Sequence, residues 1–149
     1  MVEQSHDFQR AAALLEGAGR SSAGLKRAGV CLMLAYDGAE AVGVVAVETA
    51  VDCAVMRSLL VAAPMRGRGI GAALIAAARA AAHTRGARQL YAFTPADESR
   101  YLARFGFAPV AADAALTALA ETFVGDHLRT ELQYAASMLD ISRDGIIVR

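Results

Sequence analysis

A glycine-rich segment between two periodic patterns constrains the fold of this chain more than any other feature. An apolar strand pattern ends at Val61, and the segment Arg66–Gly71 follows with glycine at every second position. Over residues 70–81 apolar side chains recur at helical spacing, and over residues 88–94 a strand pattern returns. A strand, a long helix and a second strand form a right-handed crossover, so we expect the two strands to be parallel.

The residues before this crossover predict one helix and an antiparallel meander. Residues 8–17 carry apolar side chains at helical spacing, Asp7 is suited to cap them, and glycines follow the last turn. The dipeptide Asp37-Gly38 is a strong hairpin signal between two apolar runs, and a second turn falls near Asp52. The three expected strands cover residues 31–36, 41–47 and 54–61.

The residues after the crossover predict two more helices and two more strands. We expect the helices at residues 97–105 and 114–123 and the strands at residues 107–110 and 134–141, whereas the tail after Asp140 has no clear pattern. The predicted fold is α+β, with a mixed, largely antiparallel sheet flanked by helices. The 149 residues suit a single domain over 1–149, since domains cluster at roughly 100–150 residues.

Composition and charge exclude several classes of protein. A hydrophobic content of 56% excludes a disordered chain, and fifteen basic against fifteen acidic residues argue against a nucleic-acid-binding basic face. No apolar run approaches the roughly 18–20 residues of a membrane span, and residues 1–10 lack a signal-peptide core. Cys31 and Cys53 lie in apolar runs without metal-ligand spacing, which favours core positions, no metal site and a reducing, cytoplasmic setting.

The segment Arg66–Gly71 has the chemistry of an anion site. Glycines let a ligand approach the backbone closely, and the first turn of a helix has unpaired N–H groups and a partial positive charge. Arg66 and Arg68 add full charges that suit phosphate oxygens, although solvated surface arginines are the simpler alternative. Because no Lys-Ser/Thr follows and the spacing is not Gly-x-Gly-x-x-Gly, a nucleotide P-loop and a dinucleotide site are disfavoured.

This segment also resembles a motif of a known family. Arg66-Gly67-Arg68-Gly69-Ile70-Gly71 is similar to the acyl-CoA-binding motif of the GNAT superfamily of N-acetyltransferases, which reads Gln/Arg-x-x-Gly-x-Gly/Ala. The run Tyr101–Phe107, which ends in Gly-Phe, and the order of elements over residues 31–110 resemble the same family. More narrowly, Arg57-Ser58-Leu59 and Glu48 resemble the branch often found with arsenic-resistance genes. The resemblance implies an acyl-CoA N-acyltransferase fold with splayed central strands, and acetyl-CoA as cosubstrate.

The resemblance further implies how coenzyme A is held and used. The backbone of the strand end would pair with the pantetheine arm through Leu59, Leu60 and Val61. The loop amides would hold the pyrophosphate through Arg66, Gly67, Arg68, Gly69, Ile70, Gly71 and Ala72. A primary amine would then attack the thioester, and because such an amine is mostly protonated at neutral pH, it needs a base or a water path.

Two charged side chains are candidates for binding the acceptor amine. Glu48 is a candidate base or ammonium ligand, and the alternative is a solvated carboxylate at a strand end. Arg57 is expected to alternate with Leu59 and Val61 on one strand face, where it would bind an anionic substrate group or pair with Glu48. One cation and one anion at neighbouring strand positions complement a zwitterion, which predicts an amino-acid-like acceptor.

The proton donor for the leaving thiolate is less clearly marked. The family often uses a tyrosine, but the matching position, four residues before the glycine of Gly-Phe, is Leu102. Tyr101 lies one place earlier, about 100° around a helix, so it is either the acid or a packing residue. Thr94, at the end of a strand, is a second candidate hydroxyl or a helix cap.

These observations predict an acetyl-CoA-dependent N-acetyltransferase that acts on a small, amino-acid-like amine. The alternative is a CoA-binding sensor or assembly subunit without catalysis, because the expected tyrosine is missing at Leu102. An RNA-binding domain is the weakest reading, since no aromatic stacking residues accompany the arginines. The expected partner is a small molecule; a homodimer is an open alternative, and neither nucleic acid nor a membrane is expected.

Overall fold

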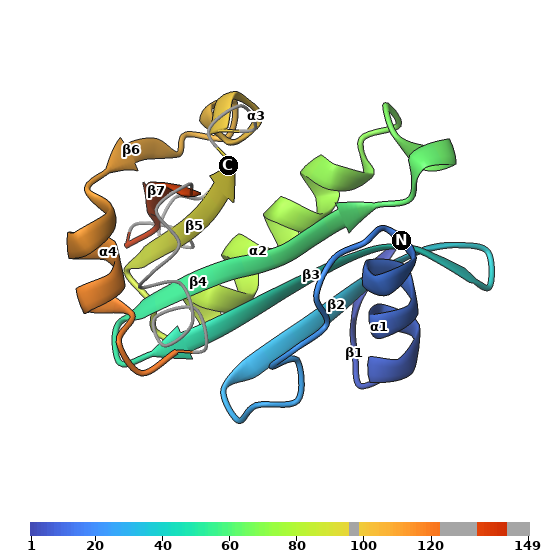
Figure 1. Ribbon diagram of the computed structural model, residues 1–149, viewed down its shortest axis with the longest axis horizontal. Coiled ribbons are helices and arrows are strands. Elements are labelled where there is room, and N and C mark those ends of the chain that lie inside the picture. The colour runs from blue at the N-terminus through green and yellow to red at the C-terminus, as the bar shows by residue number, and fades with distance from the viewer. Residues whose placement is uncertain (96–98, 123–133, 143–149) are drawn as a thin grey trace. The chain divides into compact units, whose positions relative to one another are not determined.

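The structure is a computed structural model, and it describes residues 1–95, 99–122 and 134–142 (Figure 1). The strands are β1 (Val2–Ser5), β2 (Val30–Asp37), β3 (Glu40–Ala50), β4 (Cys53–Val61), β5 (Gln89–Pro95), β6 (Ala108–Val110) and β7 (Tyr134–Asp140). The helices are α1 (Phe8–Gly17), the 3-10 helix η1 (Ala63–Met65), α2 (Ile70–Thr84), α3 (Ser99–Ala103) and α4 (Ala112–Ala118). The seven strands form one mixed sheet in the order β1-β2-β3-β4-β5-β7-β6, which confirms the predicted fold class.

The chain divides into two compact units. The first comprises residues 1–47 and 57–81, and the second comprises residues 48–56 and 82–149. The chain passes between them within β3, β4 and α2, so each of these elements contributes to both units.

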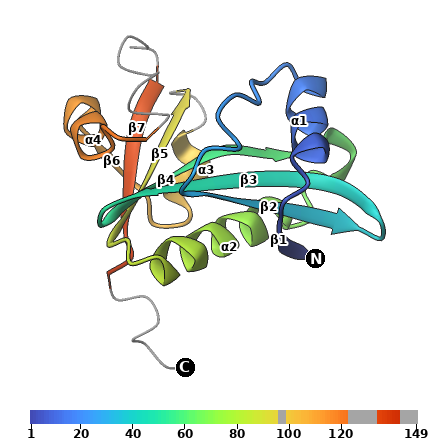
Figure 2. The same cartoon turned by 90° about the horizontal axis from the view of Figure 1, so that it is seen from below.

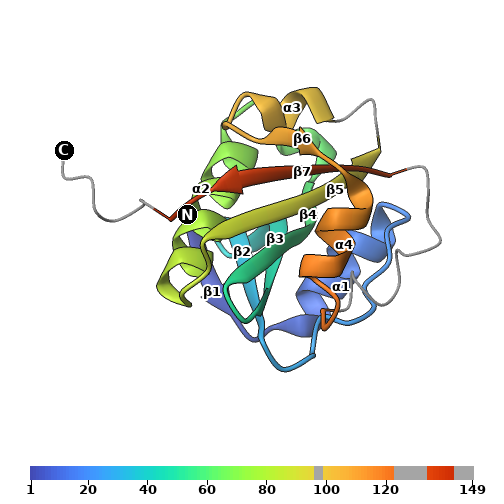
Figure 3. The same cartoon turned by 90° about the vertical axis from the view of Figure 1, so that its left-hand side faces the viewer.

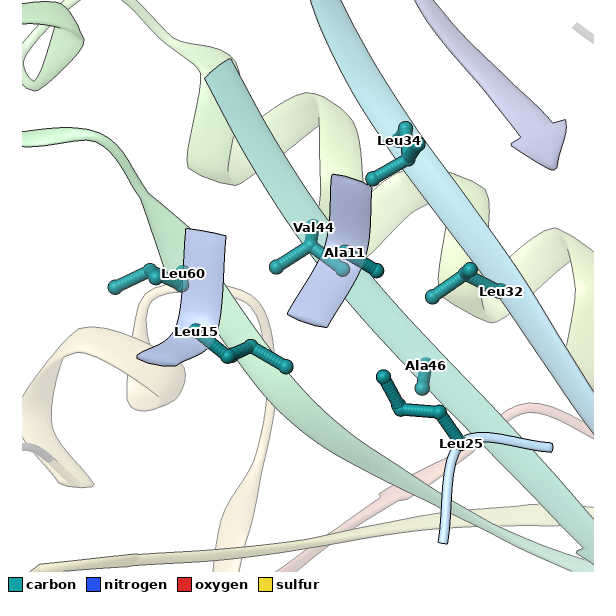
Figure 4. Packing of buried hydrophobic residues seen from close by; sticks show 8 residues of the cluster. All are labelled: Ala11, Leu15, Leu25, Leu32, Leu34, Val44, Ala46 and Leu60. Carbon is teal, nitrogen blue, oxygen red and sulfur yellow. The ribbon is translucent and has the colours of Figure 1, made fainter. Parts of the chain in front are cut away.

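In the first unit, α1 and α2 cover opposite faces of β2 and β3 (Figure 2). On the α1 side, one face of the helix packs onto alternate residues of the strands, as expected for amphipathic elements. The side chains of this cluster are those of Ala11, Leu15, Leu25, Leu32, Leu34, Val44, Ala46 and Leu60 (Figure 4). The predicted cap is confirmed, because an Asp7 carboxylate oxygen accepts from the Arg10 backbone N–H at 3.1 Å.

The α2 side of the same strands is packed closely at Gly43. A Cβ atom placed there would lie 3.0 Å from Leu74 Cδ1 and 3.3 Å from Ile70 Cγ2. Glycine therefore lets the first two turns of α2 approach β3, and this contact places the start of the helix on the sheet.

In the second unit, β5 pairs with strands on both sides. Its parallel pairing with β4 runs from Cys53↔Gln89 to Met56↔Ala92, which confirms the predicted parallel crossover. On its other side β5 pairs antiparallel with β7, which lies between β5 and β6 (Figure 3). The turn after α3 lies over β7, since a Cβ at Gly106 would be 3.1 Å from Leu139 Cδ1.

Several element boundaries differ from the predictions. The sequence did not predict β1, which pairs with β2 from Val2↔Ala35 to Ser5↔Leu32, because a four-residue edge strand with one apolar residue has no clear alternation. The helix expected at residues 97–105 is observed only over Ser99–Ala103, with residues 97 and 98 outside the described part. Helix α4 covers Ala112–Ala118 and ends before the expected residue 123. Within the described residues, no helix is long and apolar enough to cross a membrane.

Candidate active site

The glycine-rich loop of the first unit has the predicted strand-to-helix geometry. Gly67 and Gly69 have φ angles of +80° and +82°, in the left-handed region that strains any residue with a Cβ. Among the described residues, apart from the two chain neighbours, no atom lies within 4 Å of a Cβ built at either glycine, so the backbone here borders open space. Glycine is therefore required at both positions by the left-handed backbone conformation, and the absence of side chains leaves the loop backbone accessible to a ligand.

The start of α2 offers backbone donors beside this loop. The first bond of the helix runs from the Ala73 N–H to the Gly69 carbonyl at 3.1 Å. The amides of Ile70, Gly71 and Ala72 therefore precede the helical hydrogen-bond ladder and have no intrahelical acceptor. Arg66 and Arg68 are exposed next to them. Free helix amides and two guanidinium groups have the chemistry that a phosphate or pyrophosphate anion requires, so the geometry is compatible with the predicted anion site.

At the end of β4, the backbone carbonyls of two residues point away from the neighbouring strand β3. The Ala62 N–H donates to the Val42 carbonyl of β3 at 2.8 Å. Since successive residues of a strand point their polar groups to alternate edges, Leu59 and Val61 direct theirs away from β3. Two arginine side chains donate to these carbonyls: Arg20 to Leu59 at 3.4 Å, and Arg66 to Val61 at 3.1 Å.

This edge geometry fits the predicted pairing with an extended ligand. Each carbonyl oxygen has two lone pairs, so the arginine contacts leave room for a second donor. No sequence pattern predicted the contact of Arg20, which follows α1 and is 39 residues from Leu59.

A backbone irregularity lies within β4, at Ser58. Its φ is +59°, in the left-handed region, which costs of the order of 1–3 kcal/mol for a residue with a side chain. The expected regular alternation of Arg57, Leu59 and Val61 on one face is therefore wrong at this point. Strain of this kind is typical of functional sites, and serine, unlike glycine or asparagine, gave no sequence signal for it.

The two candidate substrate ligands have different surroundings. Arg57, in the first unit, is half-buried, and its guanidinium donates a hydrogen bond to the Ala23 carbonyl of the loop after α1. Glu48, in the second unit, is only 3% exposed, so the alternative of a solvated strand-end carboxylate is wrong. A carboxylate so far removed from water is either an interaction partner within the fold or a functional group.

The two candidate proton donors both lie in the second unit. Tyr101 is 38% exposed, and its ring makes an edge contact with Phe105 at 5.2 Å between centroids. Leu102, at the position that matches the family's tyrosine, is 2% exposed and belongs to the core. The hydroxyl oxygen of Thr94 is buried and has no hydrogen-bond partner among the described residues. Both hydroxyls remain candidates, and a core leucine occupies the position where the family pattern would put one.

The cysteines do not add a reactive group. Both are free and buried. Burial raises the pKa of the Cys53 thiol to about 11, with a further contribution from the hydrogen-bonded Asp52 carboxylate. The thiol therefore stays protonated at neutral pH, as expected for a core cysteine. Among the described residues, no group of three or more His, Cys, Asp or Glu side chains could hold a metal ion.

A sequence comparison connects this loop and its surroundings with a family. The sequence model of the acetyltransferase (GNAT) family matches residues 3–107, which include α1, β2–β5, the glycine-rich loop and α3. The chain belongs to the GNAT acetyltransferase family. The match supports the general resemblance carried by Arg66–Gly71, whereas it does not distinguish the arsenic-resistance branch.

Several solved structures share the fold at low sequence identity. Rv2747 from Mycobacterium tuberculosis, in complex with CoA and NLQ, aligns with a TM-score of 0.74 and 16% identity over 94% of this chain and 98% of its own. The ribosomal-protein-S18-alanine N-acetyltransferase from Escherichia coli aligns with a TM-score of 0.71 and 15% identity over 100% and 98%.

A third neighbour matches over only part of its length. N-acetylglutamate synthase from Neisseria gonorrhoeae, complexed with coenzyme A and N-acetyl-glutamate, aligns with a TM-score of 0.72 and 22% identity over 95% of this chain and 35% of its own. Coenzyme A in this complex and in that of Rv2747 is consistent with acetyl-CoA as the GNAT cosubstrate. No curated protein matches the sequence significantly.

Proposed function

We propose that this chain transfers the acetyl group of acetyl-CoA to the primary amine of a small, amino-acid-like substrate. The observation that carries the proposal is the loop Arg66–Gly71, where left-handed glycines, the first amides of α2 and two exposed arginines converge. This arrangement fits the pyrophosphate of coenzyme A, and it belongs to a chain with the GNAT sequence pattern.

The first unit supplies the groups that would bind coenzyme A. The backbone from Arg66 to Ala72 would hold the pyrophosphate, and the polar groups of Leu59 and Val61 would pair with the pantetheine amides as an added strand would. Leu60 is 8% exposed and packs in the α1 cluster, so it would support this edge from the core. Arg66 would exchange its bond to the Val61 carbonyl for phosphate oxygens, which form stronger charge-assisted bonds.

Acetyl-CoA would supply the activated acyl group, and side chains of this chain would handle the protons. Glu48 would take a proton from the substrate ammonium, directly or through one water, so that the neutral amine attacks the thioester carbon. The new C–N bond forms and the C–S bond breaks. The hydroxyl of Thr94 or Tyr101 would give its proton to the leaving thiolate and regain one from the acetylated nitrogen, so that the products are a neutral amide and the coenzyme A thiol.

The acceptor class rests on Arg57 and Glu48. A guanidinium for the carboxylate and a carboxylate for the ammonium complement a zwitterionic α-amino acid. The complex of the gonococcal enzyme with N-acetyl-glutamate supports this class of acceptor. A net charge of zero is poorly suited to a polycationic acceptor such as a polyamine.

A catalytically inactive CoA-binding subunit is the second candidate function. The observation in its favour is Leu102, which fills the family's acid position with a core side chain. Such a protein would bind coenzyme A with the same loop and release no thiol from acetyl-CoA in the presence of any amine.

Thiol release from acetyl-CoA across a panel of amino acids, polyamines, aminoglycosides and peptide N-termini tests the reaction. Calorimetry with coenzyme A tests the site: Gly71→Glu adds bulk and negative charge at the anion site and should abolish most binding. Ala80→Glu is a matched control, because Ala80 is exposed on the same helix about 13 Å farther along.

A second variant keeps the test informative if Gly71→Glu does not fold. Arg68→Glu reverses an exposed charge and should weaken coenzyme A binding about 10- to 100-fold, the effect of a lost charge-assisted bond. Wild-type affinity in both loop variants would remove the assignment, whereas binding without thiol release would favour the inactive subunit.

The wider context follows from the same proposal. We place the chain in the cytoplasm as one acetyltransferase domain over residues 1–149, and two free cysteines suit a reducing compartment. A homodimer and membership of the arsenic-resistance branch are further predictions; sedimentation would test the first.

A further inference from the structure

Two hydroxyl groups lie on one face of the β5–β7 ladder in the second unit. Ala92 of β5 is opposite Ser137 of β7, and Thr94 is opposite Ala135, without interruption of the register. Because side chains alternate between faces, Thr94 and Ser137 project from the same face as diagonal neighbours.

Both hydroxyl oxygens are buried and lack a hydrogen-bond partner in the part of the chain that the structure describes. Ser137 is 6% exposed, so its hydroxyl is not solvated from the surface. A buried hydroxyl without a partner destabilises the folded state, and native proteins nearly always satisfy such groups with protein atoms, ordered water or a ligand.

The sheet itself offers Ser137 no side-chain partner. Its neighbour on β5 is Ala92 and its neighbour on β6 is Pro109, and neither side chain has a donor or an acceptor. Thr94 is the nearest polar position in this register. Diagonal neighbours have Cα atoms about 7–8 Å apart and Cβ atoms somewhat closer, a spacing that two hydrogen bonds of about 2.8 Å through one water molecule can bridge.

We propose that the hydroxyls of Thr94 and Ser137 share one buried water molecule, and that Ser137 thereby orients Thr94 as a hydrogen-bond donor. A water that donates to Thr94 Oγ1 leaves the threonine hydrogen free to point to another acceptor. The catalytic consequence rests on the proposed function, in which that acceptor is the departing thiolate. Ser137 would then be a positioning residue, because it acts through the water and Thr94.

The shared water has a consequence for stability that does not depend on catalysis. Thr94→Val and Ser137→Ala each remove one ligand of the water and leave the other hydroxyl unsatisfied. We expect each single variant to be less stable than the wild-type protein, with an unfolding equilibrium constant about tenfold higher. The double variant removes the whole site, so it should lie within about threefold of either single variant. Chemical denaturation of the four proteins measures this cycle.

A second double-mutant cycle, with a hydroxyl outside the proposed water site, shows whether non-additive effects on stability are specific to Thr94 and Ser137. Thr117→Val removes an exposed hydroxyl of α4 that donates to the Asp113 carbonyl, and its effect should add to that of Ser137→Ala. If the unfolding equilibrium constant of the Thr94→Val/Ser137→Ala variant rises about a hundredfold, the two hydroxyls act independently, and the proposal is overturned. A gain in stability in both single variants would also overturn the proposal, because it would show that neither hydroxyl has a hydrogen-bond partner, not even a water molecule.

The catalytic part has its own measurement. Ser137→Ala should lower kcat about tenfold with an unchanged KM for acetyl-CoA, and it should have no further effect in a Thr94→Val background. Thr94→Ser keeps the hydroxyl and should retain most of the turnover. An equal loss in both backgrounds would refute positioning through Thr94. If the wild-type protein transfers no acetyl group, the proposed function fails, while the stability cycle still decides whether the two hydroxyls share a water.

Discussion

Gly43 connects the packing of the first unit with the proposed coenzyme A site. A Cβ at this position of β3 would lie 3.0 Å from Leu74 Cδ1, and 3.3 Å from both Ile70 Cγ2 and Ala35 Cβ. Carbon atoms pack best at about 3.5–4.0 Å, so Gly43→Ala must push these groups apart by several tenths of an ångström. Added methyl groups in a packed core cost about 1–3 kcal/mol, and loss of glycine's chain entropy offsets about 0.5–1 kcal/mol.

The expected net effect of Gly43→Ala is therefore a loss of about 1 kcal/mol in the free energy of unfolding, with a larger loss for Gly43→Val. Urea denaturation measures it, provided that the slope of the transition is unchanged. Gly17→Ala is the matched control, because no atom of the described residues beyond its chain neighbours and its own helix backbone lies within 4 Å of a Cβ there, and alanine favours the helix. Equal stability of Gly43→Ala and the wild-type protein would refute the packing argument.

The same substitution should affect coenzyme A, although Gly43 is not in the loop. Ile70 is the first residue of α2, and its displacement moves the amides proposed to hold the pyrophosphate. We expect the folded Gly43→Ala variant to bind coenzyme A several-fold more weakly, because hydrogen bonds from displaced amides to the pyrophosphate would be longer and weaker. The Gly17→Ala variant should bind coenzyme A with wild-type affinity. A destabilised variant with unchanged affinity would show that Leu74 absorbs the strain alone and that the helix start does not move.

The remaining predictions concern protonation and the acceptor. If Tyr101 protonates the thiolate, Tyr101→Phe should lower kcat by roughly 10²–10⁴-fold at constant coenzyme A affinity; an unchanged kcat would leave Thr94 or water as the donor. Arg57→Glu and Glu48→Arg should each raise the KM for the best amino-acid substrate, and the zwitterion hypothesis fails if neither does so or if polyamines outcompete every amino acid. Cys53 has a pKa raised from 9.0 to about 11, so its contribution to stability is full below pH 9 and is lost as the pH rises towards 11; Cys53→Ala should remove that part of the pH dependence, as thermal denaturation can show.

Local sequence signals were sufficient to predict the elements on either side of the proposed coenzyme A loop. Helix α1 was predicted at residues 8–17 with its Asp7 cap, and α2 was predicted to begin near Ile70 after the glycines. These features depend on side-chain period, capping and glycine conformation, which act over a few residues. The proposed anion site could also be predicted from local sequence, because its amides and arginines are contiguous in the chain.

The tertiary structure alone decided features that depend on residues distant in sequence. The left-handed Ser58, the burial of Glu48 and the bond from Arg20 to the Leu59 carbonyl have no local signal, because each depends on what packs or pairs opposite. The surroundings of Ser137 could not be predicted from local sequence either, because only strand register places Ala92 and Pro109 beside it and Thr94 on its diagonal. Register is set by pairing over the whole ladder, and a shift of one residue would turn the serine to the other face of the sheet.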